Sequence, residues 1–510
     1  MFKKILIANR GEIAVRILRA CRELDIRSVA VFSEVDRKSL HVRLSDEAYP
    51  IGPAPSRESY LSIDKLMDVA RRAGCDAVHP GYGFLAENAA LPRACTDRGL
   101  TFIGPPADAM EALGSKTAGR QLARRADVPT VPGINDPIEI PAEAQALAQR
   151  MGYPVLLKAV AGGGGKGMRL VNNDAEFDSA FRDASSEAMN AFGDDRLYLE
   201  KYLDRPHHVE IQIFADAHGR VVSLGERECS VQRRHQKVIE EAPSPIITPD
   251  LRKKMGDAAV RLARAGGYVN AGTVEFLVDA NLNFYFLEVN TRLQVEHPVT
   301  EQVTGLDLVK LQIAIAAGHR LPFAWESITP RGHAMEVRLY AEDPDNNFFP
   351  SPGKILSRHV PSGPGIRLDE GVYDGWTVPN DYDPLLSKLI AWGNSREETI
   401  ARLRRALDEY TITGIKTNVG LFRRILLEPD FLRGEIHTRW LDELLRRPLS
   451  TAASANDNSG QSSASDAAAI AAAISQANQS DKHSSQSTSS ADQPSRWKLE
   501  GRREQLDRLP

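Results

Sequence analysis

The sequence contains few cysteines, and their spacing excludes a paired-cysteine motif. Four occur in 510 residues and no two form a C-x-x-C pair: Cys21, Cys75, Cys95 and Cys229. This pattern is expected of free thiols in a reducing cytoplasm. The sequence also lacks an apolar run of membrane-spanning length, and its N-terminus enters a strand pattern without the features of a signal peptide. We therefore expect a cytoplasmic protein with no membrane association.

A large excess of either charge is absent as well. The chain has 64 basic and 68 acidic residues, which gives a net charge of −4. This balance gives no support for a nucleic-acid partner or a membrane surface, although local clusters still decide how small anions bind. With 42% apolar and 26% charged residues, the composition is that of a soluble globular protein, and the length predicts two to four domains.

Residues 1 to about 113 predict an α/β domain. Short apolar strands alternate with helical patterns, which indicates a parallel sheet. No G-x-G-x-x-G follows the first strand, so a dinucleotide site is not expected. The predicted strands are Lys4–Ala8, Arg27–Ser33, Ala77–Val78 and Leu100–Ile103.

The stretch from Glu288 to Glu301 carries the strongest functional pattern. If its backbone is extended, alternate side chains share one face. An edge strand with mixed charges is the alternative, but a solvated face rarely presents carboxylate, amide, guanidinium, amide and carboxylate in that order. The five side chains are Glu288, Asn290, Arg292, Gln294 and Glu296.

A β-hairpin is predicted just before this stretch, from two apolar runs that flank a turn signal. A two-residue tip would place Glu275 opposite Glu288, whereas a five-residue loop would slip the register by one and separate them. Two facing carboxylates repel each other unless a cation lies between them. With Asn290 they form an all-oxygen set that suits Mg²⁺ or Mn²⁺. The two runs are Gly272–Val278 and Asn283–Val289.

Two further segments favour the binding of phosphate or another oxyanion. The predicted strand Tyr153–Val160 carries Lys158, and four consecutive glycines follow at 162–165. Such glycines let backbone N–H groups approach a phosphate, although a flexible surface loop is the alternative and the motif is not a Walker A loop. The polar segment Glu226–Glu241 suits a solvated face, but it also supplies lysine and arginine for an oxyanion.

The C-terminal part divides into two regions. Residues 318 to about 447 contain short strands, Pro/Gly turns and two helical segments, Arg396–Tyr410 and Asn418–Leu427. Within them Arg338 suits a surface charge and a functional role equally well. Residues 448–510 are rich in Ser, Ala, Gln, Asn and Asp, and cannot bury enough surface to fold alone, so a low-complexity, disordered tail is expected.

Several segments together match the pattern of one known family. They are Ile7–Ala14, His79–Leu85, Gly114–Lys116, Gly162–Met168, Gln232–Lys237 and Glu288–Thr300, with Arg338 in its strand. On these residues, 1 to about 447 resemble biotin carboxylase, the ATP-grasp subunit of biotin-dependent carboxylases. The resemblance implies mixed α/β and α+β architecture. The implied domains are a Rossmann-like N-terminal domain (1–113), an ATP-grasp domain (114–317) with a mobile lid at about 131–203, and a C-terminal biotin carboxylase domain (318–447).

The resemblance also implies roles for individual residues. ATP would be held by Lys116, Lys158, Gly163, Gly164, Gly165, Glu200, Lys201, Tyr202, Leu203, His208, Gln232, His235, Glu275 and Glu288. Two Mg²⁺ or Mn²⁺ ions would bind Glu275, Glu288 and Asn290, and bicarbonate would bind Lys237, Arg292, Gln294 and Val295. The implied catalytic residues are Glu296 as general base, Lys237, Arg292 and Arg338. Biotin would contact Tyr82 and Arg338, and Arg338 would stabilise its enolate.

The implied reaction is the ATP-dependent carboxylation of biotin by bicarbonate through carboxyphosphate, the first half-reaction of acetyl-CoA carboxylase in fatty acid synthesis. No Met-Lys-Met turn is present, so the biotin is expected on a separate carrier protein. The resemblance also implies carboxyltransferase subunits as partners and a homodimer of this chain. The same component of a pyruvate, propionyl-CoA or other acyl-CoA carboxylase is the close alternative, because the carboxyltransferase selects the acceptor. Another ATP-grasp ligase or an inactive scaffold fits less well, since no internal duplication is visible and every matched catalytic position is filled.

Overall fold

A computed structural model describes residues 1–447, apart from 135–136, 139, 161–166 and 324–329. Residues Met1–Arg446 form one packed unit. The predicted phosphate loop with Gly163, Gly164 and Gly165, and the predicted disordered tail at 448–510, lie outside the described residues. In the part of the chain that is described, no helix is both long and apolar enough to cross a membrane.

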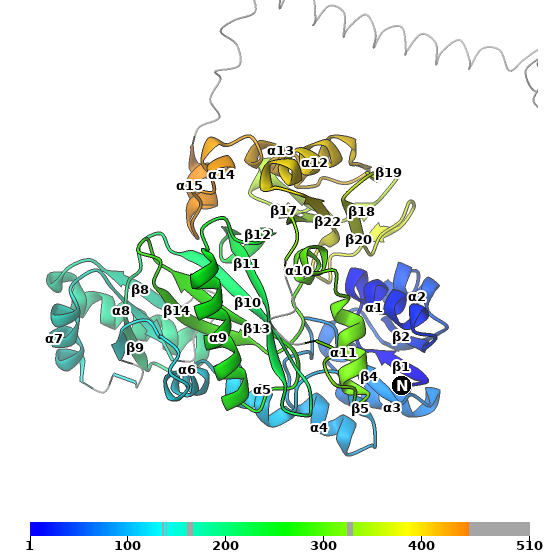
Figure 1. Cartoon of the computed structure of the whole chain (residues 1–510), viewed down its shortest axis with the longest axis horizontal. Coiled ribbons are helices and arrows are strands. Elements are labelled where there is room, and N and C mark those ends of the chain that lie inside the picture. Colours follow the sequence, from blue (N-terminus) through cyan, green and yellow to red (C-terminus); the bar gives the residue numbers. More distant parts are fainter. Residues whose placement is uncertain (135–136, 139, 161–166, 324–329, 448–510) are drawn as a thin grey trace, which may run out of the picture. The chain divides into compact units, whose positions relative to one another are not determined.

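The N-terminal part folds around a parallel sheet, as the sequence predicts, and Glu47–Gly52 adds a fifth strand to the four predicted ones (Figure 1). Along the first strand, Ile5 and Ile7 pack into one core and Leu6 into another, so both faces of the sheet are covered. The strand order is β3-β2-β1-β4-β5. The strands are β1 Lys4–Ile7, β2 Arg27–Ser33, β3 Glu47–Gly52, β4 Ala77–His79 and β5 Thr101–Phe102, and the helices α1 Gly11–Glu23, α2 Leu40–Leu44, α3 Ile63–Ala73, α4 Ala90–Thr96 and α5 Ala107–Gly114.

A four-stranded antiparallel sheet follows, with a hydrophobic core of its own. Val155, Leu157 and Leu199 from its strands pack there against Phe177. A separate core is what a lid that moves as one body requires, and the motion of residues 131–203 stays a prediction. The sheet has the order β6-β9-β7-β8. The elements are α6 Lys116–Arg125, β6 Gly133–Ile134, α7 Pro141–Met151, β7 Val155–Ala159, β8 Met168–Val171, α8 Phe177–Phe192 and β9 Leu197–Lys201.

The largest sheet has eight antiparallel strands in the order β14-β13-β10-β11-β12-β15-β22-β20. Strand β12 pairs with β15, with Ile239 opposite Val337, so the sheet crosses the predicted domain limit at 317. That limit therefore stays a prediction. The strands are β10 His207–Ala215, β11 Val221–Arg233, β12 Gln236–Ala242, β13 Asn270–Val278, β14 Phe284–Asn290, β15 His333–Tyr340, β20 Ile366–Glu370 and β22 Leu385–Gly393.

Helices and short strands complete the unit. Helix α9 lies across β10 and β11 (Figure 1), and α12 packs on β22. The helices are α9 Pro249–Ala265, α10 His297–Thr304, α11 Leu308–Ala316, α12 Arg396–Glu409, α13 Val419–Ile425, α14 Pro429–Arg433 and α15 Trp440–Arg446. The short strands are β16 Glu342–Asp343, β17 Phe349–Pro350, β18 Gly353–Lys354, β19 Ser357–His359, β21 Thr377–Val378 and β23 Thr411–Thr413.

Alternation along β10 separates the core from the polar face of the large sheet. Val209, Ile211 and Ile213 pack into the same core as helix α9. His208 and Glu210 belong to the opposite set of positions, because successive side chains of a strand point to opposite faces. The polar face is nevertheless buried, with Glu210 at 0% exposure. This face carries the candidate site.

The predicted extended conformation of residues 288–301 is wrong beyond Asn290. Strand β14 ends there, and helix α10 begins at His297 with a proline in its first turn. Proline at that position fits a helix start, because its fixed φ is helical and its missing N–H would have no partner within the helix. The polar alternation of this stretch therefore belongs to a strand end, a loop and a helix start.

The predicted hairpin is confirmed. Its register has the five-residue loop of one alternative and the pairing of Glu275 with Glu288 of the other. Val278 pairs with Phe284, which leaves a five-residue loop. A register shift between Glu275 and Phe276 then restores the pairing of Glu275 with Glu288. A bulge inserts one residue into one strand of a pair, so it offsets the one-residue slip that the loop introduces.

Candidate active site

A cavity of about 780 Å³ lies against the polar face of the large sheet. It gathers the predicted site residues that the structure describes with their side chains, except Tyr82. These are Lys158, Glu200, Lys201, Tyr202, Leu203, His208, Gln232, His235, Lys237, Glu275, Glu288, Asn290, Arg292, Gln294, Val295, Glu296 and Arg338. Lys116 begins helix α6, and its side chain lies outside the part of the structure that is described. Their collection in one cavity is a finding of the structure, whereas the role of each stays a prediction.

Three carboxylates form a row across neighbouring strands on this face. Glu288 on β14 pairs with Glu275 on β13, which pairs in turn with Glu210 on β10. Arg227 on β11 continues the row, because it is the register partner of Glu210. Like charges at directly opposite positions destabilise a sheet unless cations compensate them. The site therefore needs its own cations to fold.

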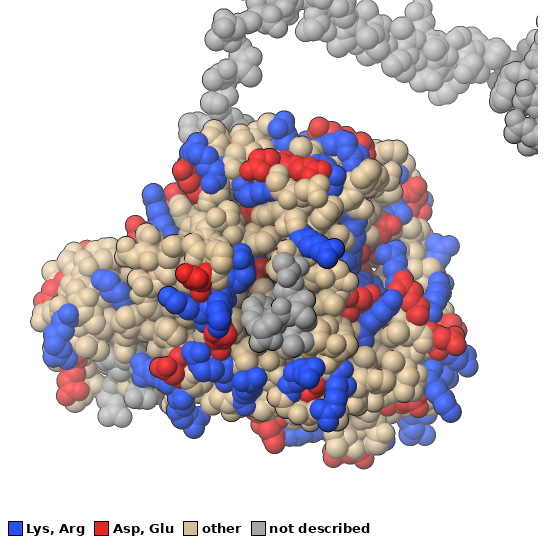
Figure 2. Space-filling view, viewed as in Figure 1, with Lys and Arg blue, Asp and Glu red and all other residues tan. Residues whose placement is uncertain are grey.

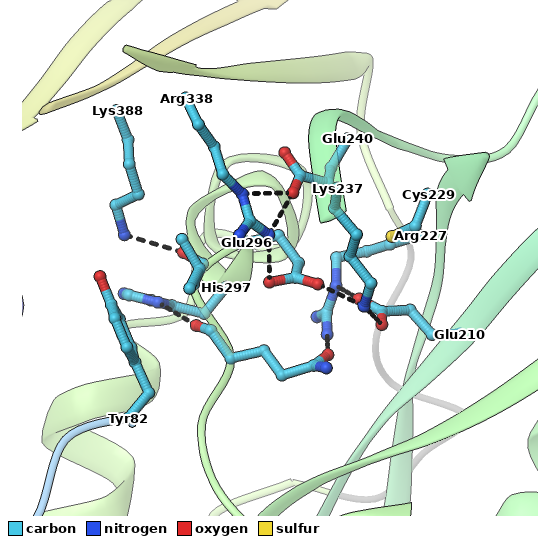
Figure 3. Close-up of polar contacts among 12 residues, drawn as sticks. Tyr82, Glu210, Arg227, Cys229, Lys237, Glu240, Glu296, His297, Arg338 and Lys388 are labelled. Carbon is cyan, nitrogen blue, oxygen red and sulfur yellow. Dashed lines mark hydrogen bonds and ion pairs between the residues drawn. The ribbon is translucent and has the colours of Figure 1, made fainter. Parts of the chain in front are cut away.

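Lys237 supplies the central cation (Figure 3). Its Nζ lies 2.6 Å from Glu210 Oε2, 2.8 Å from Glu275 Oε1 and 2.7 Å from Glu296 Oε1. An ammonium group has three N–H donors, so these three carboxylates use its full capacity. Burial alone lowers the pKa of Lys237, but the three glutamates outweigh burial and hold it well above its ordinary value. An anion that binds Lys237 must therefore take over one of these donors.

Glu296 lies between two cations, and this contact defines the chemistry of the site. Lys237 bonds one of its oxygens, and Arg338 Nη2 lies 3.1 Å from the other. The side chain is 1% exposed. Burial raises the pKa of Glu296, but Lys237, Arg338 and Arg227 together lower it below its ordinary value. Glu296 is thus ionised at neutral pH, with a cation bonded to each of its two oxygens.

Arg338 is held from the opposite side by Glu240. Its Nε donates to Glu240 Oε1 at 2.7 Å, and Nη2 forms an ion pair with the same oxygen. Burial raises the pKa of Glu240 to about 7, although Arg338 acts in the opposite direction. The guanidinium is therefore fixed in place by two carboxylates and bounds the cavity near Glu296.

Arg227 holds two side chains of the site, those of Glu210 and Gln294, in place. It is fully buried, and its Nε pairs with Glu210 at 2.5 Å. Its terminal nitrogens donate to Gln294 Oε1 at 3.0 Å and to three further side chains, those of Gln212, Thr273 and Thr300. All five guanidinium donors are thereby used. Arg227 fixes the orientation of Gln294, which in turn donates to Glu275 at 3.0 Å.

The predicted ATP-binding residues enclose the other end of the cavity. Lys158 on β7 lies 2.5 Å from Glu200 Oε2 on β9, and Arg120 pairs with the second oxygen of Glu200. On the large sheet, His208 Nε2 lies 2.9 Å from Glu275 Oε2, and the Gln232 amide nitrogen lies 2.6 Å from His208 Nδ1. Burial lowers the pKa of His208, but the Glu275 charge outweighs this and raises it. Cations for an anionic ligand thus line both walls.

His235 reaches the cavity from a tight turn between β11 and β12. Arg233 pairs with Gln236, so Arg234 and His235 form a two-residue hairpin. Both have positive φ, at 50° and 67°, a region that side-chain-bearing residues seldom adopt. Such strain persists where the surroundings enforce it, and it is commonly found at functional sites.

Two predicted residues have surroundings that the sequence did not indicate. Tyr82 donates to Glu12 and faces Lys388, whose Nζ lies 5.8 Å from its ring centroid. Arg292 lines the cavity, but its Nε pairs with Glu87 Oε2 at 3.0 Å and its Nη2 donates to Asn290 Oδ1 at 3.2 Å. Arg292 therefore lines the cavity while its guanidinium is paired with Glu87 of the N-terminal domain.

The predicted metal ligands fit a hard divalent cation by chemistry. Glu275 and Glu288 face each other, and their carboxylate oxygens are ligands that Mg²⁺ and Mn²⁺ prefer. The Asn290 amide turns its nitrogen to Glu275 Oε1 at 2.7 Å, while its oxygen accepts from Arg292, so Asn290 would have to rotate its amide to bind a cation beside Glu275. Potential ligand atoms of His208, Glu210 and Glu275 also lie within 4.8 Å of one another, but Lys237 already bonds both carboxylates there.

Sequence reasoning missed several charged residues that contact the predicted ones, including Glu210, Arg227, Glu240 and Glu87. Glu210 has a visible signal, because it alternates with apolar residues between His208 and Gln212. Arg227 and Glu240 lie in the polar segment 226–241, for which a solvated face was an alternative, and both are buried in the structure. Glu87, which pairs with Arg292, has no sequence signal that we recognise.

Comparisons with known proteins agree with this architecture. Three family models match: biotin carboxylase N-terminal domain at residues 1–110, carbamoyl-phosphate synthase L chain ATP binding domain at 115–324, and biotin carboxylase C-terminal domain at 336–443. The fold and site thus define an ATP-dependent carboxylase with the mixed α/β, three-domain architecture that the sequence predicted. The chain belongs to the biotin carboxylase family.

Relatives with different names match the chain at similar levels. A pyruvate carboxylase subunit of Methanothermobacter thermautotrophicus is 54% identical over 88% of this chain and 91% of its own length. Biotin carboxylase of Halalkalibacterium halodurans is 53% identical over 88% and 98%. The biotin carboxylase domain dimer of Hydrogenobacter thermophilus 2-oxoglutarate carboxylase, in complex with MgADP, ADP and bicarbonate, has 46% identity and a TM-score of 0.82 over 88% of this chain and 100% of that chain.

Proposed function

We propose that this chain carboxylates biotin with bicarbonate and ATP as the first half-reaction of an acetyl-CoA carboxylase. The observation that carries the reaction is the position of Glu296, an ionised and buried carboxylate held between Lys237 and Arg338. A base between two cations suits a reaction whose substrates are anions. Figure 2 shows basic and acidic side chains intermixed on the visible face.

ATP binds between the two walls of the cavity in this proposal. Lys158, His208 and His235 offer donors to phosphate oxygens, and Lys201 at the end of β9, with Tyr202 and Leu203 after it, lines the cavity beside them. Lys158 then exchanges its contact with Glu200 for a phosphate contact. Phosphoryl transfer depends mainly on positioning and on neutralising charge, which these residues supply. Glu275, Glu288 and Asn290 would hold Mg²⁺ or Mn²⁺, which would neutralise phosphate charge when bound.

Bicarbonate occupies the region between Lys237, Arg292, Gln294 and the backbone of Val295. It takes over one Lys237 donor, and its negative charge offsets the cations that lower the pKa of Glu296. The basicity of Glu296 therefore rises when substrate binds. Glu296 removes the bicarbonate proton, and the resulting oxygen attacks the γ-phosphate of ATP. The products are carboxyphosphate and ADP.

Biotin lies toward Arg338 and Tyr82. Carboxyphosphate breaks down to CO₂ and phosphate, and the phosphate removes the proton of the ureido nitrogen. Arg338 offsets the enolate charge that results, because its contacts with Glu240 and Glu296 fix the guanidinium. The deprotonated ureido nitrogen then attacks the CO₂, which gives carboxybiotin. Water would hydrolyse carboxyphosphate, so the predicted lid at about 131–203 closes over the cavity during the reaction in this proposal.

The partners proposed are a biotin carrier protein and carboxyltransferase subunits, with a homodimer of this chain. The relatives named as carboxylase subunits, and the dimer of the Hydrogenobacter thermophilus domain, support this assembly. Acetyl-CoA is the proposed final acceptor. The relative named as part of a pyruvate carboxylase favours pyruvate as the second candidate.

Reconstitution distinguishes the acceptors. The purified chain is combined with the biotin carrier and each carboxyltransferase encoded in the same genome, and incorporation of labelled bicarbonate into acetyl-CoA, propionyl-CoA and pyruvate is measured. The proposal predicts malonyl-CoA as the main product. Labelled oxaloacetate without malonyl-CoA would assign the chain to a pyruvate carboxylase instead.

A further inference from the structure

Lys388 stands out as a fully buried lysine that no predicted role uses. Its side chain is 0% exposed. Nζ donates to the backbone oxygen of Val295 at 2.8 Å (Figure 3). It also lies 3.2 Å from Glu12 Oε1. A buried ammonium is costly unless each donor finds a partner. Burial alone lowers the pKa of Lys388, but Glu12, Glu336 and Asp369 outweigh it and raise the pKa, so the group stays charged.

The position of Lys388 in the sheet relates it to the site. On the strand pair β15 and β22, Lys388 is the register partner of Arg338. The two cations extend from neighbouring strands to consecutive residues: Arg338 to the Glu296 carboxylate and Lys388 to the Val295 carbonyl. Two like charges at paired positions are unfavourable unless each has its own counter-charge, which Glu240 and Glu12 provide.

Lys388 also connects three parts of the chain. It comes from β22, while Val295 lies in the loop before α10, and Glu12 lies in the first turn of α1. Glu12 accepts the hydroxyl hydrogen bond of Tyr82, which sits beside Lys388. One ammonium group therefore fixes the carbonyl of the predicted bicarbonate loop and borders the predicted biotin residue.

We propose that Lys388 is a positioning residue that holds the Val295–Glu296 turn, and thereby the bicarbonate site, in its productive orientation. The inference rests on the proposed function. The ammonium of this lysine contacts the Val295 carbonyl and Glu12 and borders the Tyr82 ring, none of which is a predicted ATP-binding residue, so its loss should affect bicarbonate binding and spare ATP binding. An unpaired Val295 carbonyl would let the turn shift, and small misplacements at a reacting centre cost large factors in rate.

Steady-state kinetics of ADP release test this with three variants. Lys388→Met is expected to raise the KM for bicarbonate about tenfold or more, with the KM for ATP within twofold of the unaltered protein. Lys388→Arg keeps a charged donor with a larger head group, so a smaller rise in the bicarbonate KM alone is expected. The control is Lys354→Met, at an exposed position, which should change neither constant.

The outcomes separate the possible failures. Proportional changes in both KM values, or a lower melting temperature with unchanged KM values, would mean that Lys388 is merely structural and would overturn the positioning role. Lys388→Arg gives the same decision when the methionine variant does not fold. Absence of bicarbonate-dependent and biotin-stimulated ADP release in the unaltered protein would instead overturn the proposed function, and this inference with it.

Discussion

The ammonium of Lys237 lies 2.7 Å from Glu296, and the same ammonium also holds Glu210 and Glu275. The proposed general base is thus linked through one cation to the row of carboxylates that would meet the metal ions and phosphates. Because each of these charges sets the pKa of its neighbours, substrate binding at one end of the cavity changes proton affinity at the other. Individual substitutions should therefore separate the steps of the reaction.

Replacement of Glu296 by glutamine tests the general base. The amide keeps the size of the side chain but cannot accept the bicarbonate proton, so bicarbonate-dependent ADP release should fall about 100-fold or more. Lys237 retains Glu210 and Glu275, and Arg338 retains Glu240, so folding and ATP binding should be nearly unchanged. Isothermal titration with ATP measures the latter. Loss of ATP binding would refute the assigned role, and exposed Glu143→Gln is the matched control.

Arg338→Gln should separate the two chemical steps. Without the guanidinium the biotin enolate loses its stabilising charge, so biotin-stimulated turnover should fall about 100-fold. Glu296 keeps Lys237, so bicarbonate-dependent ADP release without biotin should stay within a few fold. Both activities are measured on one preparation, with exposed Arg264→Gln as the control. An equal loss of both would show that Arg338 acts before biotin is carboxylated.

Lys158→Met tests the ATP end of the cavity. A charge-assisted hydrogen bond contributes roughly 1.5–3 kcal/mol, so the KM for ATP should rise at least about tenfold. The proposed bicarbonate residues lie on β12 and in the loop after β14, away from β7, so the KM for bicarbonate should change little. Exposed Lys254→Met serves as the control. A Lys158→Met variant with the ATP affinity of the unaltered protein would remove Lys158 from the ATP site.

The pH dependence of the free energy of unfolding should reveal the raised pKa of Glu12. Burial raises the pKa of Glu12 from 4.5 to about 7, against the opposing effect of Lys388. Between these values the folded protein binds more protons than the unfolded chain, so Glu12 makes the free energy of unfolding fall as pH rises from 4.5 to about 7. The full effect is at most about 3 kcal/mol.

Glu12→Gln removes this titration. Melting temperatures of both proteins are measured by thermal unfolding from pH 5 to pH 8. The unaltered protein should lose stability relative to the variant up to about pH 7 and run parallel to it above that pH. Parallel curves over the whole range would contradict a raised pKa of Glu12.

The sequence predicted the sheet types well, because apolar periodicity is local. The parallel strands from Lys4 to Phe102 and the alternation from His208 to Ile213 are both present. It also predicted residues that line one cavity, because the matched motifs carry them. The roles of those residues stay predictions.

Register and burial were harder to predict, since both depend on distant parts of the chain. The bulge near Glu275 leaves no trace in the apolar pattern, yet it decides which carboxylates face each other. Arg227 and Glu240 look like surface charges until their partners on neighbouring strands are placed. The loop after Asn290 kept a period-two polar pattern that indicates a strand, while Pro298 was the local signal for the helix that follows.

The most direct test of the account is ADP release by the purified protein with Mg²⁺ and ATP, with and without bicarbonate and free biotin. The account predicts that biotin stimulates ADP release and that this stimulation requires bicarbonate. ATP turnover that is indifferent to biotin would contradict it and point to a different ATP-grasp ligase reaction at the same site.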